Sequence, residues 1–279
     1  MVPPFPPSCA TRPLAYHARQ TLNDAKGIFV MSLRFHEIAE TNHRILNPVS
    51  EAQLMQLGAI CRLAPGMRQL DLCCGKAEML SRWAAQFGIS GEGVDISPVF
   101  LAAARKRVAE LGVSERIALV QGDAGAHHIA PHSFDIVSCI GATWIGNGIS
   151  GTIDLMRGGL RDANSLLLIG EPFWQEQPPA AAYAAFTGGD AEAYTSLAGT
   201  LDRIEASGFE LVEMVLADHA GWDRYVAMQW LAASDWLRAN PNDPGDGELR
   251  AWIAHGRRSY LEYGRRYFGW GVFVLRPRI

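Results

Sequence analysis

Apolar and polar positions follow two different periods along the chain. Apolar residues at helical spacing predict a helical region over 33–63, which ends at Pro65-Gly66. Short apolar runs next to turn residues predict strands, and segments of helical spacing separate most of these strands. The expected strands cover 69–73, 91–95, 117–120, 134–140 and 165–169, and the expected helices between them cover 77–87, 98–111 and 152–160. Strands separated by helical crossovers predict a mostly parallel sheet with helices on both faces.

This rhythm changes after Glu171. A Pro- and Ala-rich insertion at about 172–196 is too long for a plain connection, which favours a lid or a pocket wall. A helix over 197–206 and strands over 209–217 and 271–275 then complete a sheet of seven strands. A second insertion at about 218–268 separates the last two strands, with helical spacing on either side of a turn at 240–247. We therefore expect a doubly wound α/β fold with helical insertions, formed by one domain over 31–279.

Composition restricts the class of protein. The chain has 279 residues, of which 48% are hydrophobic and 19% are charged, as is typical of a globular protein with one large domain. The formal net charge of −4 offers no positive surface for a polyanion. We therefore expect a small-molecule substrate, no nucleic acid or membrane as a partner, and a monomer or homodimer.

The first residues and the cysteines bear on processing and location. Residues 1–30 contain prolines but no hydrophobic signal core, so we interpret them as a flexible extension or as the result of a misassigned start. The five cysteines do not follow the spacing of a disulfide framework or of a zinc knuckle, and no metal site is expected. We interpret them as reduced thiols of a cytoplasmic protein.

The turn after the first strand suits a ligand that carries a positive charge and no phosphate. Ligands of open α/β sheets bind beyond the carboxyl ends of the central strands. Asp71 lies in the strand, and Gly75 is the single glycine of a turn in which a dinucleotide-binding protein has three. The Asp71 carboxylate can balance a cation directly or through a water. S-adenosylmethionine therefore fits this turn better than a phosphate-bearing cofactor.

Two further acidic residues end the next two strands. Asp95 can accept hydrogen bonds from both ribose hydroxyls of a nucleoside, although Asp95-Ile96-Ser97-Pro98 is also an ordinary start of a helix. Asp123 and the adjacent backbone N–H can read the edge of adenine, although a lone Asp there is more often a turn residue. Acids at the ends of three consecutive strands form a joint pattern that indicates adenosyl binding.

These residues resemble motifs I, II and III of the class I S-adenosylmethionine-dependent methyltransferases, and 134–139 resembles the fourth-strand segment of that family. The resemblance spans about 54–275, and several blocks are similar to a bacterial small-molecule branch: 43–48, 141–144, 170–174, 221–225 and 268–273. It implies a methyltransferase that binds S-adenosylmethionine and releases S-adenosylhomocysteine. The implied cofactor contacts are Asp71, Cys73, Gly75, Asp95, Ile96, Asp123, Ala124 and Ile140. One departure is that the family usually has glycine where Cys73 and Ala77 stand.

Methyl transfer from a sulfonium is an in-line displacement, so the protein contributes mainly by alignment and by excluding water. A hydroxyl or thiol acceptor also profits from a base, and the candidates are His43, near the N-terminal helical region, and Glu171, at the end of the fifth strand. A helix-capping or surface position is the competing interpretation of His43. Core packing competes likewise with the candidates for the walls of an acceptor pocket, which are Trp144, Trp174, Trp222 and Tyr225.

Three other functions stay open at this point. A non-catalytic S-adenosylmethionine-binding protein is one, because Cys73 adds bulk to the cofactor turn. A nicotinamide-dependent oxidoreductase is a second, although the single glycine of that turn disfavours it. A polyamine synthase that uses decarboxylated cofactor is a third, but it needs an acidic pocket for the amine, and no acid pair follows the fourth strand.

Overall fold

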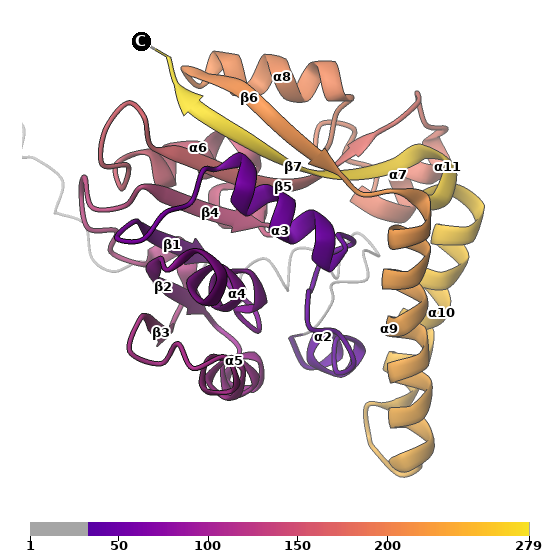
Figure 1. Cartoon of the computed structure of the whole chain (residues 1–279). Helices are drawn as coiled ribbons and strands as arrows, with labels where there is room; N and C mark the ends of the chain where they lie inside the picture. Colours follow the sequence, from indigo (N-terminus) through magenta and orange to yellow (C-terminus); the bar gives the residue numbers. More distant parts are fainter. Residues whose placement is uncertain (1–32, 279) are drawn as a thin grey trace, which may run out of the picture.

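The computed structural model describes residues 33–278, so the interpretation of residues 1–30 lies outside the described part. Seven strands form one sheet in the order β3-β2-β1-β4-β5-β7-β6 (Figure 1). The parallel strands are β1 (Arg68–Leu72), β2 (Ser90–Asp95), β3 (Ile117–Gln121), β4 (Ile136–Ile140) and β5 (Leu166–Trp174). β7 (Phe268–Pro277) is antiparallel to both of its neighbours, β5 and β6 (Phe209–Leu216). The expected doubly wound sheet of seven strands is confirmed.

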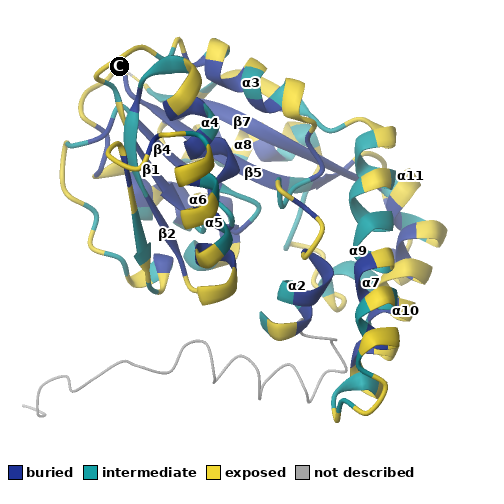
Figure 2. Ribbon diagram, turned by 60° about the horizontal axis from the view of Figure 1, so that its bottom comes forward, coloured by how far each residue is buried: buried dark blue, intermediate teal, exposed yellow. Residues whose placement is uncertain are grey.

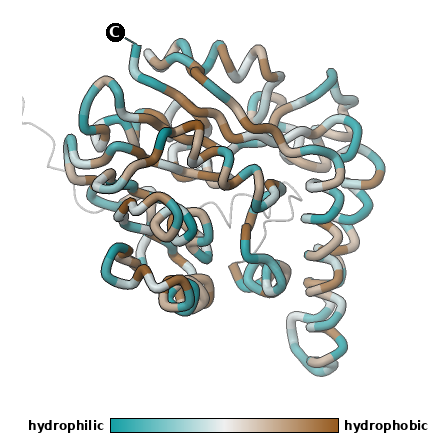
Figure 3. The backbone as a smooth tube through the Cα atoms, in the orientation of Figure 1, coloured by the Kyte–Doolittle hydropathy of each residue, from teal (hydrophilic) through white to brown (hydrophobic). Residues whose placement is uncertain are grey.

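Helices cover both faces of the sheet. α3 (Glu51–Ile60), α4 (Glu78–Phe87) and α5 (Pro98–Glu110) pack on one face, and α6 (Ile149–Arg157) and α8 (Leu197–Ala206) on the other. Each face of the sheet has its own buried apolar core. Leu168 of β5 is buried in the core under α3, α4 and α5, and its neighbour Leu167 is buried in the core under α6 and α8, because successive side chains of a strand point to opposite faces. Figure 2 shows the central strands β1, β4, β5 and β7 as the buried centre of the molecule, and Figure 3 shows that this centre is also its most apolar part.

The helical region expected over 33–63 is divided in two. α2 (Leu33–Ala39) and α3 are joined by an irregular segment, residues 40–50, which we call the strap. Pro48 disfavours helical geometry in the residue before it, and Ser50 starts α3 with a capping box that it shares with Gln53. The expectation of helical structure is therefore wrong for the strap.

The two insertions follow β5 and β6. The first contains α7 (Ala180–Thr187), and the second contains α9 (His219–Ala239), α10 (Asp246–Ser259), the π-helical turn η3 (Tyr260–Gly264) and α11 (Arg265–Tyr267). In Figure 1, α9 and α10 run side by side away from the sheet, and α2 lies next to α9. Phe35 of α2 shares a buried apolar cluster with Leu237 of α9 and Ile253 of α10. Between residues 33 and 278, no helix has both the length and the apolar character that crossing a membrane requires.

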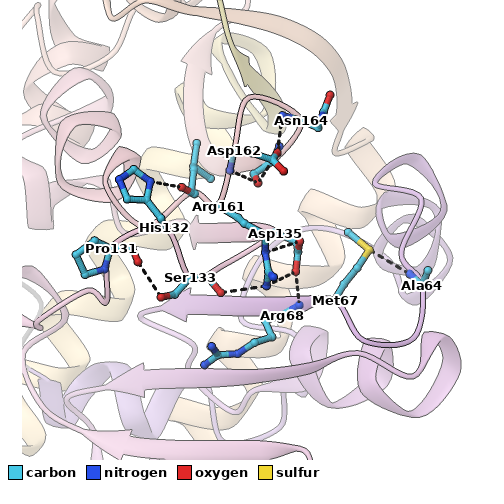
Figure 4. Close-up of polar contacts among 12 residues, drawn as sticks. Ala64, Met67, Arg68, Pro131, His132, Ser133, Asp135, Arg161, Asp162 and Asn164 are labelled. Carbon is cyan, nitrogen blue, oxygen red and sulfur yellow. Dashed lines mark hydrogen bonds and ion pairs between the residues drawn. The ribbon is translucent and has the colours of Figure 1, made fainter.

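Polar contacts hold the edge of the sheet where the parallel strands begin (Figure 4). Asp135, just before β4, accepts a hydrogen bond of 2.7 Å from the backbone N–H of Arg68 at the start of β1. The same carboxylate accepts a hydrogen bond from the Arg161 guanidinium at 3.0 Å. Asp135 thus joins the start of β1 to the segment before β5, and both of these contacts are structural.

Candidate cofactor and acceptor site

Asp95 is held at the carboxyl end of β2 by backbone donors. Its side chain is 6% exposed, and its Oδ2 accepts a hydrogen bond of 2.7 Å from the Gly75 N–H. Its Oδ1 accepts a hydrogen bond of 2.8 Å from the Ser97 N–H. The cap of α5 is Ser97, whose Oγ accepts a hydrogen bond from the Phe100 N–H, so Asp95 is not needed for capping. Each oxygen of Asp95 keeps a lone pair for a hydroxyl group, as the ribose role requires.

Asp71 and Asp95 form a buried acidic pair at neighbouring strands. Asp71 is 3% exposed, and burial raises the pKa of its carboxyl to about 7 although the Ser138 hydroxyl donates a hydrogen bond of 2.6 Å to it. The negative charge of Asp95 raises the pKa of Asp71 further, and burial raises the pKa of Asp95 as well. A cationic ligand at this edge favours the ionised form of both groups. The pair therefore fits a sulfonium cofactor with an amino group.

The turn between Asp71 and α4 has left-handed backbone at three positions. Cys73 has a φ of 57°, Gly75 of 56° and Ala77 of 51°. Such a conformation costs a residue with a Cβ about 1–2 kcal/mol, and glycine avoids the cost. The two departures from the family pattern therefore occupy positions where glycine is easier to accommodate. The Cys73 side chain packs against the buried cluster that contains Cys139, on the face covered by α6 and α8.

The remaining predicted cofactor residues lie at the same edge of the sheet. Asp123 follows β3, and its Oδ1 accepts a hydrogen bond of 2.9 Å from the Gly125 N–H, so it also has the turn role that was the alternative. Ala124 is buried beside it, and Ile140 ends β4. Ile96 is 42% exposed directly after Asp95, which provides an apolar surface for a purine ring.

Comparisons with known proteins agree with this arrangement. The family described as "Methyltransferase domain" matches residues 70–157. "Uncharacterized protein YjhP" of Escherichia coli (strain K12) is 42% identical over 246 residues, which are 88% of this chain and 98% of that protein. The SAM-dependent methyltransferase from Geobacter sulfurreducens, crystallised with S-adenosyl-L-homocysteine, has a TM-score of 0.84 and 42% identity over 90% of this chain and 100% of its own. The chain belongs to the S-adenosylmethionine-dependent methyltransferases.

A second methyltransferase structure leads to the same family. The SAM-dependent methyltransferase from Thiobacillus denitrificans, also crystallised with S-adenosyl-L-homocysteine, has a TM-score of 0.83 and 39% identity over 89% of this chain and 100% of its own. The predictions of the family, of methyl transfer and of S-adenosylmethionine as the cofactor are thereby confirmed. The residues that hold the cofactor and the acceptor in this methyltransferase stay predictions, which the geometry supports to different degrees.

Glu171 is a buried acid of β5, beyond the level at which β4 ends. It lies in β5 one residue beyond Gly170, which pairs with the last residue of β4, and it is 1% exposed. Its Oε2 has no hydrogen-bond partner among the described residues, while Thr143 after β4 forms a side-chain hydrogen bond with the carboxyl group. Burial raises the pKa of Glu171 to about 7. The group is therefore poised to exchange a proton near neutral pH.

His43 and Tyr225 belong to a buried network that fixes the strap on α9. The His43 ring is 6% exposed, which excludes the surface interpretation, and its Nε2 lies 3.0 Å from the Tyr225 backbone oxygen. Its Nδ1 lies 3.0 Å from Oε2 of Glu40. The Tyr225 hydroxyl donates a hydrogen bond of 2.7 Å to Glu40, and so does the Gln229 side chain. Both ring nitrogens of His43 thus face protein atoms, which favours Glu171 over His43 as the base.

The predicted aromatic residues separate into two places. Trp174 and Trp222 both pack against Phe268, at ring-centroid distances of 4.8 and 6.1 Å, whereas Trp144 is 59% exposed. Within the described part of the chain, the buried indole N–H groups of Trp174 and Trp222 have no acceptor. Leaving such a donor unpaired costs about 1–3 kcal/mol, so these two N–H groups are suited to bind a polar atom of a ligand.

Sequence reasoning missed the residues that support this site. Glu40, which has no exposed surface, and Lys76, which hydrogen-bonds to the strap, were not singled out. The one available signal was a lysine inside the glycine-poor turn, directly after Gly75. Apart from His43, which lies three residues after Glu40, the side-chain partners of both residues lie more than 30 positions away in the sequence, so local pattern did not reveal them.

Replacing Glu171 by glutamine should change how stability depends on pH. The unfolded chain ionises this carboxyl near pH 4.5, whereas the folded protein keeps it protonated up to about pH 7. The folded state thus loses stability as the pH rises through this window, by about 3 kcal/mol in total for a shift of this size. Glutamine does not ionise, so Glu171→Gln should gain most of that amount over the parent protein between pH 5 and pH 8.

Urea unfolding of both proteins at pH 5 and pH 8 measures this difference. Glu210→Gln is a matched control, because Glu210 is an exposed acid of β6. A free-energy difference between Glu171→Gln and the parent protein that stays constant over this pH range would contradict a buried, unpaired Glu171.

Proposed function

We propose that this methyltransferase methylates a small molecule whose accepting oxygen, nitrogen or sulfur atom loses a proton to Glu171. Asp71, Asp95 and Asp123, with Gly75, Ile96, Ala124 and Ile140, hold the cofactor at the ends of β1 to β4. Bound there, the cofactor supplies an electrophilic methyl group on a positively charged sulfur. The acceptor lies between this edge, the strap and the two insertions, with Trp174 and Trp222 as walls.

The burial of Glu171, together with its unpaired carboxyl oxygen, is the observation that carries the proposal. An ionised carboxylate that is 1% exposed and has a free oxygen attracts a proton from a neighbouring donor. Its raised pKa, about 7, makes it a better base than an exposed glutamate while leaving part of it ionised at neutral pH. Because it is buried, it also holds the acceptor away from water.

An entry route for the acceptor lies beside Glu171. A depression of about 390 Å³ is lined by Trp174, Tyr183, Tyr194 and Arg203, among others. Tyr194 and Arg203 are close enough to Glu171 for their charges to act on one another: the charge of Glu171 contributes to the raised pKa of Tyr194, after burial. Both side chains line the depression, so the depression is the proposed route from solvent toward Glu171.

Charge and thiol chemistry support the other parts of the proposal. The net charge is −4, and Arg258, Arg265 and Arg266 of the arginine-rich C-terminal part each face a carboxylate. Such pairs leave little positive surface for a polyanion, which favours a small-molecule acceptor over nucleic acid. The described cysteines are free thiols, which agrees with a cytoplasmic location.

Two measurements test the proposal. Calorimetry with S-adenosylhomocysteine and with NAD(P) should show binding of the first only. Incubation with methyl-labelled S-adenosylmethionine and a panel of phenols, amines and thiols should then transfer label to at least one compound. Tight cofactor binding with no transfer to any small molecule would favour a non-catalytic S-adenosylmethionine-binding protein, and transfer only to nucleic acid or protein would contradict the small-molecule acceptor.

A further inference from the structure

Lys76 uses its full hydrogen-bonding capacity on the strap. Its Nζ donates to the backbone oxygens of Glu40 at 2.7 Å, Thr41 at 3.1 Å and His43 at 2.6 Å. An ammonium group has three donors, so none is left for a ligand. Lys76 therefore acts on the cofactor site only through the position of the turn and of the strap.

The turn that carries Lys76 needs such external support. Cys73 and Ala77 have a left-handed backbone, at a cost of about 1–2 kcal/mol each, and lie on either side of Gly75 and Lys76. Strained residues of this kind persist only where surrounding contacts hold them in place. Gly75 donates its N–H to Asp95, so a change in the turn also moves the donor on the ribose-binding acid.

The strap lies against the same turn. A Cβ at Gly75 would come within 2.6 Å of the Leu46 side chain, and a Cβ at Gly141, after β4, would come within 2.4 Å of Oδ1 of Asn47. The strap is in turn anchored to α9, because the Tyr225 hydroxyl hydrogen-bonds to Glu40 and to the Leu46 backbone oxygen. The strap is thus a fixed support on which the Lys76 ammonium holds the turn.

We propose that Lys76 is a positioning residue whose bonds to the strap hold the cofactor turn in its left-handed conformation, as a substitute for the glycines that Cys73 and Ala77 replace. The inference rests on the proposed binding of the cofactor at this turn. It predicts that Lys76 contributes to cofactor affinity only while Cys73 and Ala77 strain the turn. Where glycine at these two positions removes the strain, the contribution of Lys76 to the affinity should be small.

A double-mutant cycle tests this dependence with S-adenosylhomocysteine as the probe. Lys76→Met keeps the length and apolar stem of the side chain and removes the three donors. In the parent protein it should weaken binding about tenfold to a hundredfold, as expected for the loss of hydrogen bonds to a charged group. In a background that carries Cys73→Gly and Ala77→Gly, the same replacement should weaken binding less than about threefold, because the turn then holds its shape unaided.

Calorimetry on the four proteins gives both sides of the cycle. Equal losses of affinity in the two backgrounds, or no loss in the parent protein, would overturn the inference. Lys106→Met is the matched control, since Lys106 is exposed on α5. Thermal unfolding shows whether each variant folds, and if Lys76→Met does not, Lys76→Gln, which removes the charge but keeps a polar side chain, takes its place with the same expected dependence on background. If the parent protein itself does not bind S-adenosylhomocysteine, the proposed cofactor site fails, and that result is distinct from a failed cycle.

Discussion

Asp95→Ala should weaken the binding of S-adenosylhomocysteine by about 1–3 kcal/mol. The carboxylate is the expected acceptor for the ribose hydroxyls, and hydrogen bonds to a charged acceptor are stronger than those between neutral groups. The structure adds a second contribution, because the same carboxylate holds the Gly75 N–H and the Ser97 N–H in place. Alanine removes the ribose contact and releases the turn, so the upper half of this range is expected. Isothermal titration calorimetry measures the change directly.

Two variants separate these contributions. Asp95→Asn keeps one acceptor oxygen and should lose less affinity than Asp95→Ala. Glu115→Ala removes an exposed acid from the loop before β3 and should leave the affinity unchanged, which controls for the change in net charge. If Asp95→Ala bound S-adenosylhomocysteine as tightly as the parent protein, the role of Asp95 in holding the cofactor would be refuted.

The arrangement of the cofactor edge could be predicted because it depends on local pattern. Each strand is predicted by a short apolar run. Asp71 lies within the first run, and Asp95 and Asp123 lie at or just after the ends of the next two runs. In a parallel sheet the carboxyl ends of neighbouring strands meet at one edge, so acids distant in sequence are brought together by topology alone. The register pairs Asp71 with Gly93 and Asp95 with Gln121, so these strand ends do lie side by side.

The support behind that edge could not be predicted in the same way. The strap contains Pro48 and two asparagines, which disfavour a helix, but its exact path also depends on tertiary bonds from Lys76. His43 was expected as a base and Tyr225 as a pocket wall because both residue types suit those tasks. The structure shows that the His43 ring and the Tyr225 hydroxyl both contact Glu40. The Tyr225 contact forms only because the second insertion, which carries Tyr225, packs against α2 and the strap. No periodicity within either segment contains that information.

Carboxyl groups have different environments at the two edges of the sheet. At the edge where the parallel strands begin, Asp135 is satisfied by the Arg68 N–H and by Arg161. At the opposite edge, burial raises the pKa values of Asp71 and Glu171 to about 7, and Glu171 has an oxygen without a partner among the described residues. Such groups destabilise the fold when they ionise, and buried carboxyl groups with perturbed pKa values in one region mark a candidate functional site.

The largest loss of activity is expected from Glu171→Gln. With an acceptor that the panel identifies, the turnover rate should fall by about a hundredfold to ten-thousandfold, the range of a general base. Glutamine keeps the size of the side chain and the hydrogen bond with Thr143 but accepts no proton. The affinity for S-adenosylhomocysteine should stay unchanged, because Glu171 lies in β5, away from the acids on β1, β2 and β3. Steady-state rates and calorimetry on the same preparation measure both quantities.

The pH profile separates a base from a group that merely shapes the pocket. A base acts only when ionised, so the parent rate should fall about tenfold per pH unit below the Glu171 pKa of about 7 and level off above it. The residual rate of Glu171→Gln should lack this step. Glu210→Gln, which changes an exposed acid of β6 outside the lining of the depression beside Glu171, should keep both the rate and the step. A Glu171→Gln variant that retained the parent rate and its pH dependence would assign the proton transfer to another group, or show that the acceptor needs none.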